Sequence, residues 1–339
     1  MLNAKVHLSG KIFKDTIDQI PTRNGFGEGL VEAGEKNPQV VALCADLIES
    51  TRTIDFAKKF PERFIEVGVA EQALATIAAG MANYGKIPFI ASYAAFSPGR
   101  NWEQIRTTIA LNDVPVKIVG CHAGVSVGPD GATHQMLEDI AIMRAMPNMI
   151  VLVPCDSVEA KKATMAAAEN GKPTYLRFAR EKTQVFTTEK TPFKIGEAYV
   201  LWDTSHGTRD TTNQVAIIGC GPILYEVLLA AKELEKSEIG CIVLNSHTIS
   251  PIDEQAIVSV ARKCGAIVTV EEHQINGGLG SAVAEVVTRN WPVPIEYVGM
   301  PNCFGESGQL EELLEKYGMT AKHIVEAVKR VITRKNDRD

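Results

Sequence analysis

The sequence lacks the features of several large classes of protein. It has no run of 18 or more apolar residues, so we expect no membrane-spanning helix. Basic residues are not in excess: the net charge of -6 argues against nucleic acid as the main partner, because a phosphate backbone needs a basic surface. The opening segment MLNAKVHLSGKIFKD contains no apolar core of a signal peptide. We therefore expect a cytoplasmic protein with no membrane contact.

Closely spaced cysteine pairs are also missing. None of the seven cysteines belongs to a C-x-x-C pair, and most of them lie in apolar runs, at positions 44, 121, 155, 220, 241, 264 and 303. This distribution is typical of buried, reduced thiols in a cytosolic protein and argues against zinc. We predict that the chain holds no metal site of its own.

What the sequence does contain is a regular alternation of short apolar runs and helical stretches. The 339 residues are 45% hydrophobic and 22% charged, as in ordinary globular proteins. The alternation predicts an α/β fold with two doubly wound, mostly parallel sheets. A polar, threonine-rich segment separates them, so we expect a lead-in (1–20), a first domain (21–183), a linker (184–212) and a second domain (213–339). The expected strands are VVALC (40–44), FIEV (64–67), IPFIA (87–91), PVKIVG (115–120), MIVLV (149–153), TYLRF (174–178), VAIIG (215–219), GCIVLN (240–245), AIVTVEE (266–272) and PIEYVGM (294–300).

The stretch GCHAGVSVGPDGATHQ (120–135) is the strongest candidate for a site. His122, Asp130 and His134 lie in a glycine-rich loop between an expected strand and a helix expected to begin at Thr133. Ligands of open α/β sheets bind at such strand ends, and free backbone N–H groups suit a phosphorylated, hydroxylated ligand. A metal site is the competing interpretation, but its third ligand would have to come from elsewhere.

Three further groups of residues also follow expected strands or begin helices. Glu71 lies in the first turn of a nearly all-apolar helix, where the helix dipole alone would favour a carboxylate. Tyr93 and Phe96 are either core residues or a platform for a flat heterocycle. Three arginines at element ends are candidates for phosphate contacts, although most such arginines are simply solvated: Arg23, Arg177 and Arg180.

A second glycine cluster, GGLG (277–280), follows the strand that ends in VEEH (270–273). A lone cluster of this kind is weak evidence for phosphate binding. We interpret it as a structural turn with close helix packing, and we assign no chemistry to His273.

Taken together, GVAEQ, SYAAF, CHAGVSVGPDGATHQ, MPNMIVLVPCDS and VEEH…GGLGSAVAEV resemble the C-terminal half of transketolase in order and spacing. The resemblance extends from about Thr22 to the last helix. It implies the separate C-terminal subunit of a split transketolase, with a pyrimidine-binding domain (21–183) followed by a transketolase C-terminal domain (213–339).

The resemblance implies a role for each candidate residue near the cofactor, thiamine diphosphate. Glu71 matches the glutamate that hydrogen-bonds the aminopyrimidine ring and so promotes proton loss from the thiazolium carbon. Tyr93 and Phe96 match the aromatic wall around the pyrimidine, where the family usually has Phe in place of Tyr93. Asp46 matches an aspartate near the cofactor.

The remaining candidates resemble residues that bind the sugar phosphate. Asp130 resembles the aspartate that reads the donor's hydroxyl configuration, and His134 resembles the histidine beside the reacting carbons. Pro129 departs from the family's usual acidic residue and leaves the identity of the sugar open. The residues that resemble those at the phosphate end are Arg23, Ser50, His122 and Arg180.

The family's diphosphate and magnesium motif, GDG followed by asparagine about 30 residues later, is absent from the sequence. The resemblance therefore implies half a cofactor site. The other half would come from an N-terminal, diphosphate-binding subunit that anchors both thiamine diphosphate and magnesium. We expect an obligate partner and an α2β2 assembly.

Three alternatives stay open at this point. A deoxyxylulose-phosphate synthase shares the architecture but more often carries Arg at the position of His122. The β-type subunit of a 2-oxo acid dehydrogenase first component also shares it, and the DGATH string and His122 argue against that enzyme. A non-catalytic scaffold would have no need of Glu71, Asp130 and His134.

Overall fold

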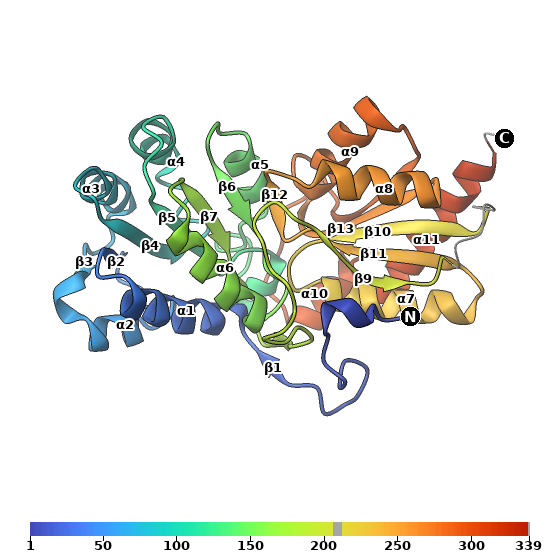
Figure 1. Ribbon diagram of the computed structural model, residues 1–339, viewed down its shortest axis with the longest axis horizontal. Helices are drawn as coiled ribbons and strands as arrows, with labels where there is room; N and C mark the ends of the chain where they lie inside the picture. Colours follow the sequence, from blue (N-terminus) through green and yellow to red (C-terminus); the bar gives the residue numbers. More distant parts are fainter. Residues whose placement is uncertain (206–211, 338–339) are drawn as a thin grey trace.

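The chain forms two α/β lobes that lie side by side (Figure 1). The structure, a computed structural model, describes residues 1–205 and 212–337. Residues 206–211, which belong to the expected linker 184–212, lie outside the described residues. In the described ranges, no helix is both long and apolar enough to cross a membrane. Six cysteines are buried, as predicted, and Cys303 is exposed.

The first lobe is built on a seven-stranded sheet in the order β12-β6-β7-β5-β4-β2-β3. All neighbouring pairs are parallel except β12 with β6. Strands β2 and β5 are buried along their whole length, as expected of parallel strands covered on both faces. The bounds are β2 (Val40–Cys44), β3 (Phe64–Glu66), β4 (Ile87–Tyr93), β5 (Lys117–Cys121), β6 (Ile150–Leu152), β7 (Thr174–Arg177) and β12 (Thr248–Ser250).

Helices cover both faces of this sheet. Phe26 and Leu30 of α1 (Thr22–Lys36) and the alanines of α6 (Ser157–Glu169) pack on one face. Leu74 and the alanines of α3 (Glu71–Asn83) pack on the other. The remaining helices of this lobe are α2 (Ile54–Lys59), α4 (Trp102–Gln104), which continues as a π-helix (Ile105–Ala110), and α5 (Asp139–Arg144). Apolar stripes on helices between strands produce this doubly wound arrangement.

The second lobe contains a five-stranded sheet in the order β14-β13-β10-β11-β9. Only its edge strand β9 is antiparallel. Helices α7 and α11 pack on one face, and α8 and α9 on the other. The strands are β9 (Tyr199–Asp203), β10 (Gln214–Gly219), β11 (Gly240–Asn245), β13 (Ile267–Gln274) and β14 (Ile295–Met300). The helices are α7 (Leu224–Lys236), α8 (Glu254–Cys264), α9 (Leu279–Asn290), α10 (Leu310–Lys316) and α11 (Ala321–Asn336). Both sheets confirm the predicted fold class.

Three contacts join the lobes in ways that the sequence pattern does not predict. Strand β12 follows β11 of the second lobe yet pairs with β6 at the edge of the first sheet. The lead-in lies on the second lobe, where the main-chain N–H of Asn3 donates to the carbonyl of Leu201 (2.9 Å). A short two-stranded sheet joins β1 (Gln19–Ile20) to β8 (Thr183–Gln184). The two lobes therefore share a continuous structure.

One predicted helix start was wrong. The helix expected from Thr133 begins only at Asp139. Met136 forms an isolated β-bridge with Ala123, and this pairing holds the preceding backbone out of a helix.

Candidate functional site

The sequence-predicted residues gather at one edge of the first sheet. They follow the carboxyl ends of neighbouring strands, as ligand-binding residues do in open α/β sheets. Asp46 and Ser50 follow β2, and Glu71 follows β3. Tyr93 is the last residue of β4, and Phe96 follows that strand. His122, Asp130 and His134 follow β5, and Arg180 follows β7, while Arg23 enters from the start of α1.

Aromatic rings form the centre of this site. The rings of Tyr93 and Phe96 are nearly parallel, 7° apart in orientation with centroids 5.8 Å apart. His134 lies edge-on to both rings, at 5.9 Å from Tyr93 and 5.3 Å from Phe96. His122 packs against Tyr93 at 4.1 Å. The parallel rings of Tyr93 and Phe96 make a flat, polarisable wall of the kind that accommodates a heterocycle, and the two histidines border it.

Arg23 joins two strand ends next to this wall. Its Nη1 donates to the carbonyl of Ser50 (3.0 Å) and lies 2.8 Å from Nε2 of His122. Arginine can only donate, so Nε2 accepts and the ring proton of a neutral His122 is on Nδ1. Nδ1 is buried and has no hydrogen-bond partner among the described residues. A buried donor of this kind fits an acceptor oxygen of a ligand.

The imidazole of His122 is held neutral. Burial, followed by the charges of Arg23, Arg180 and His134, lowers its pKa from 6.5 to about 3. A neutral ring can keep accepting from Arg23 while it donates from Nδ1. The two side chains therefore present one cation and one neutral donor at the same point.

This lowered pKa predicts a pH dependence of stability. The folded-state pKa lies below the unfolded value of 6.5, so as the pH falls below 6.5 the unfolded chain gains the proton first and stability is lost. Between pH 7 and pH 5, His122 should account for about 2 kcal/mol of that loss. Urea unfolding of the wild type and His122→Asn at both pH values measures this. The variant should lose about 2 kcal/mol less, and an identical loss in both proteins would contradict the prediction.

Asp130 and Arg180 are paired with each other. Arg180 Nη1 lies 2.9 Å from Oδ2 of Asp130, and it also donates to the carbonyl of Val127 (3.3 Å). Both side chains are about 30% exposed, at 30% and 29%. Arg180 lies in the segment that follows β7, and Asp130 is the last residue of the 3-10 helix Val125–Asp130. The pair therefore offers a cation and a carboxylate side by side to a ligand with both anionic and hydroxyl groups.

Glu71 is the first residue of α3, and its side chain is only 6% exposed. Its Oε1 accepts from Arg100 Nη1 (3.1 Å), and the guanidinium of Arg100 lies 3.9 Å above the ring of Phe96. Arg100 is not among the candidate residues predicted from the sequence, although its position four residues after Phe96 is a usable signal. The structure thus adds Arg100 to the group formed by Glu71 and the aromatic wall.

Asp46 and Ser50 are joined to the site less directly. The carboxylate of Asp46 is exposed, and its main-chain N–H donates to Glu66 Oε1 (2.7 Å) from a left-handed backbone conformation with φ 56°. Ser50 contributes its main-chain carbonyl to Arg23. Both residues therefore lie at the rim of the site, beyond β2.

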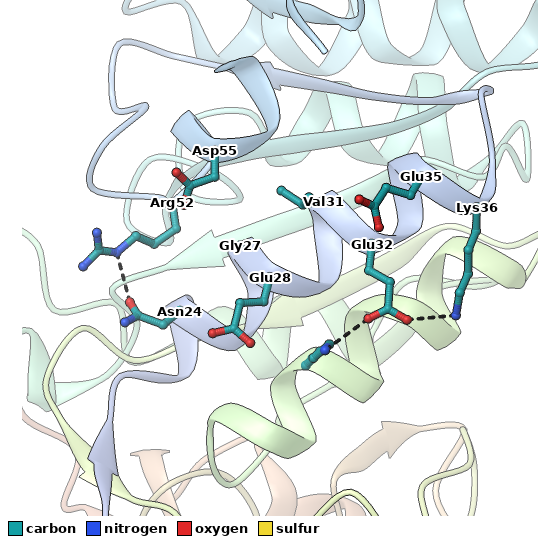
Figure 2. Close-up of a pocket in the computed structure, with 10 residues that line it drawn as sticks. Asn24, Gly27, Glu28, Val31, Glu32, Glu35, Lys36, Arg52 and Asp55 are labelled. Carbon is teal, nitrogen blue, oxygen red and sulfur yellow. Dashed lines mark hydrogen bonds and ion pairs between the residues drawn. The ribbon is translucent and has the colours of Figure 1, made fainter. Parts of the chain in front are cut away.

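A hollow of about 680 Å³ lies elsewhere, along α1 (Figure 2). Within its lining, Glu32 pairs with Lys36 and Lys161, and Arg52 donates to Asn24 (3.0 Å). None of the predicted site residues lines it, so we assign it no chemistry.

The glycine cluster of the second lobe is a structural turn, as the sequence analysis favoured. The carboxylate of Glu271 accepts the N–H groups of Leu279 (2.7 Å) and Gly280 (2.8 Å) at the start of α9. A Cβ on Gly278 would lie 2.0 Å from Glu271 Oε2. The chain's own carboxylate occupies the place that a phosphate would take. Within residues 1–205 and 212–337, no group of three or more His, Cys, Asp or Glu side chains could hold a metal ion.

Comparison with known proteins gives the same assignment over nearly the whole chain. The model of the transketolase pyrimidine-binding domain matches residues 18–185, and that of the transketolase C-terminal domain matches residues 207–324. A protein of Methanocaldococcus jannaschii described as a transketolase C-terminal section is 43% identical over 91% of this chain and 96% of its own length. The 6-deoxy-6-sulfo-D-fructose transketolase subunit SqwH of Clostridium sp. (strain MSTE9) is 39% identical over 96% and 99%.

A longer relative and a solved structure support the same family assignment. Rat transketolase is 35% identical over 94% of this chain, which spans 50% of the rat protein. A solved structure described as a split gene transketolase, inactive beta4 tetramer, superposes with a TM-score of 0.85 at 43% identity, over 93% of this chain and 99% of that one. This chain thus belongs to the transketolase family, as the C-terminal subunit of a split transketolase.

Proposed function

We propose that this subunit, assembled with an N-terminal diphosphate-binding subunit, transfers a two-carbon ketol unit from a ketose phosphate to an aldose phosphate. The observation that carries this proposal is the grouping of Glu71, the parallel rings of Tyr93 and Phe96, and the Arg23–His122 pair at one sheet edge. This group combines a carboxylate, a stacking wall and an anion-binding pair. A ketol transfer on a phosphorylated sugar needs all three.

The site fits the pyrimidine half of thiamine diphosphate. When bound, this cofactor supplies the carbon nucleophile for the donor carbonyl. Glu71 would hold a proton at the aminopyrimidine ring nitrogen, and its burial beside Arg100 fixes the carboxylate in one orientation. Tyr93 and Phe96 would stack on the pyrimidine, and Asp46 would lie near it at the rim. The diphosphate and magnesium would be anchored by the partner, because this sequence lacks the GDG motif.

The substrate half of the site would bind the sugar phosphate. Arg23, His122 and Arg180 would contact the phosphate, with the carbonyl of Ser50 holding Arg23 in place. Asp130, held in its ion pair with Arg180, would recognise a hydroxyl group of the sugar. His134, edge-on to the aromatic wall, would lie beside the reacting carbons and exchange protons with the sugar oxygens.

The partner's docking surface would include the exposed side of α3 and the π-helix after α4. Four large apolar side chains are exposed on or next to these elements: Ile77 on α3 (40%), Val69 before it (69%), Tyr84 after it (91%) and Leu111 after the π-helix (74%). Apolar exposure of this extent is typical of an interface. The description of a solved relative as an inactive tetramer of β subunits supports the same view, that a C-terminal subunit by itself is inactive. We propose an α2β2 assembly in the cytoplasm.

The donor sugar has two candidate classes. Sugar phosphates of the pentose phosphate type suit the arginines at the site. A sulfosugar is the second candidate, because a 39% identical relative is named as a 6-deoxy-6-sulfo-D-fructose transketolase subunit. A sulfonate would contact the same arginines, and Pro129 beside Asp130 departs from the family's usual acidic residue.

A donor panel tests the proposed function. The chain is co-expressed with a candidate N-terminal subunit, and the purified complex is assayed with xylulose 5-phosphate, with 6-deoxy-6-sulfofructose, and with pyruvate, each with an aldose phosphate acceptor. We expect two-carbon transfer from one of the two ketoses. Turnover of pyruvate alone would instead identify a synthase or a 2-oxo acid dehydrogenase component, and a complex that binds its partner without any turnover would indicate a scaffold.

A further inference from the structure

The end of β13 in the second lobe contacts the loop that carries Asp130 and His134. Glu272 and Gln274 contact this loop, and His273 between them contacts α5. Glu272 Oε1 accepts from the main-chain N–H of Ser126 (2.6 Å), and His273 Nε2 accepts from that of Ala141 in α5 (3.3 Å). The N–H of Gln274 donates to the carbonyl of Leu137 (2.9 Å). The substrate loop, residues 124–137, is thus bonded to the second lobe near both of its ends.

Glu272 is fitted closely into the start of the substrate loop. It is 5% exposed, and a Cβ on Gly124 would lie 2.2 Å from its Oε1. Gly124 also has a φ of 89°, which a side chain would strain. From the first lobe, Arg177 donates to the main-chain carbonyl of Glu272 (2.8 Å). Arg177 therefore holds the main chain of Glu272, and the buried carboxylate of the same residue holds the main chain of Ser126.

A second tether lies at the other end of the loop. Gln135 Nε2 donates to the carbonyl of Glu306 in the second lobe (2.9 Å) and to the carbonyls of Val125 (3.2 Å) and Gly128 (3.3 Å) within the loop. One amide therefore joins the beginning, the middle and the end of the substrate loop to the segment that precedes α10.

We propose that the second lobe sets the position of the substrate loop through Glu272 and Gln135, which act as positioning residues for Asp130 and His134. As far as it concerns the substrate, this inference rests on the proposed function. The two carboxylates of the VEEH segment (270–273) then have different roles, and Glu272 is the one that positions the substrate loop. Glu271, adjacent and equally buried, faces the start of α9 and caps that helix.

Hydrogen exchange of the folded chain tests the tether without any assay of activity. In Glu272→Ala the Ser126 N–H loses its acceptor, so amides of residues 124–131 should exchange about tenfold faster, while those of β13 and α9 stay protected. In the matched control Glu271→Ala, the faster amides should be those at the start of α9. Equal protection of the substrate loop in Glu272→Ala and the wild type, or the same pattern in both variants, would overturn the proposal. If Glu272→Ala does not fold, Gln135→Ala tests the loop from its other tether, with the same expected exchange.

Kinetics of the assembled enzyme then measure the consequence for the substrate. Glu272→Ala should raise KM for the ketose donor about tenfold with a smaller change in kcat, because a displaced loop misplaces binding groups. Glu272→Gln should restore KM most of the way, since its amide oxygen can still accept from Ser126. An unchanged KM in Glu272→Ala, or equal defects in the Ala and Gln variants, would refute the positioning role. If the wild-type complex turns over no ketose, the proposed function fails, while the exchange result still stands.

Discussion

Replacing Glu71 by alanine in the assembled enzyme is expected to lower kcat by about 10²- to 10⁴-fold, the range that general acid–base groups contribute. The variant would lack the carboxyl group that relays a proton to the aminopyrimidine ring. Glu71 is the one acidic residue in the first turn of α3, so no neighbouring carboxylate of that turn can replace it. Steady-state assays with a saturating ketose donor measure the loss, and a near-normal kcat would refute the relay.

A control variant separates this loss from damage to the fold. Glu103 lies nearby on α4 and is exposed, and Glu103→Ala should leave kcat unchanged. The Glu71→Ala chain should still fold, because the released guanidinium of Arg100 is already 50% exposed and can be solvated. Thermal unfolding of both variants checks that they are folded.

The second large effect concerns the cofactor. The isolated chain should bind thiamine diphosphate with magnesium at least about a hundredfold more weakly than the complex does. Each charge-assisted hydrogen bond contributes about 1.5–3 kcal/mol, and all of those to the diphosphate would come from the partner. Isothermal titration of the chain alone, and again with the N-terminal subunit present, measures the difference. Tight binding of thiamine diphosphate by the chain alone would refute the proposal that the chain holds only half of the cofactor site.

A surface variant makes this test more specific. Ile77 is exposed on α3, and Ile77→Asp would place a charge in the proposed docking surface. We expect it to weaken cofactor binding only through loss of the partner, so that higher partner concentrations restore it. Trp291 is a matched apolar residue, 45% exposed on the second lobe, and Trp291→Asp should leave binding unchanged.

Much of the fold follows from local sequence. Every expected strand lies on one observed in the two large sheets, because continuous runs such as VVALC suit strands buried on both faces. The site is also largely predictable. In a parallel sheet the carboxyl ends of the strands meet at one edge, so polar residues placed there are brought together.

The pairings within the site do not follow from the sequence. Arg23 meets His122 across 99 residues, and Arg180 and Asp130 pair from the segments that follow β7 and β5. These contacts depend on β7, β5, β4 and β2 being neighbours in the sheet, and strand order is a tertiary property. The same holds for the Glu71–Arg100 pair, which requires α3 to pack beside the turn after β4.

The sequence by itself determined the fold class, the family and the residues of the candidate site, because each of these follows from local periodicity or from motifs of fixed spacing. Only the tertiary structure decided which charges pair, where α5 begins and how the second lobe holds the substrate loop. Those features depend on contacts such as Glu272 with Ser126, 146 residues apart. Their energies arise from burial and from hydrogen-bond geometry, which exist only once the lobes have packed together.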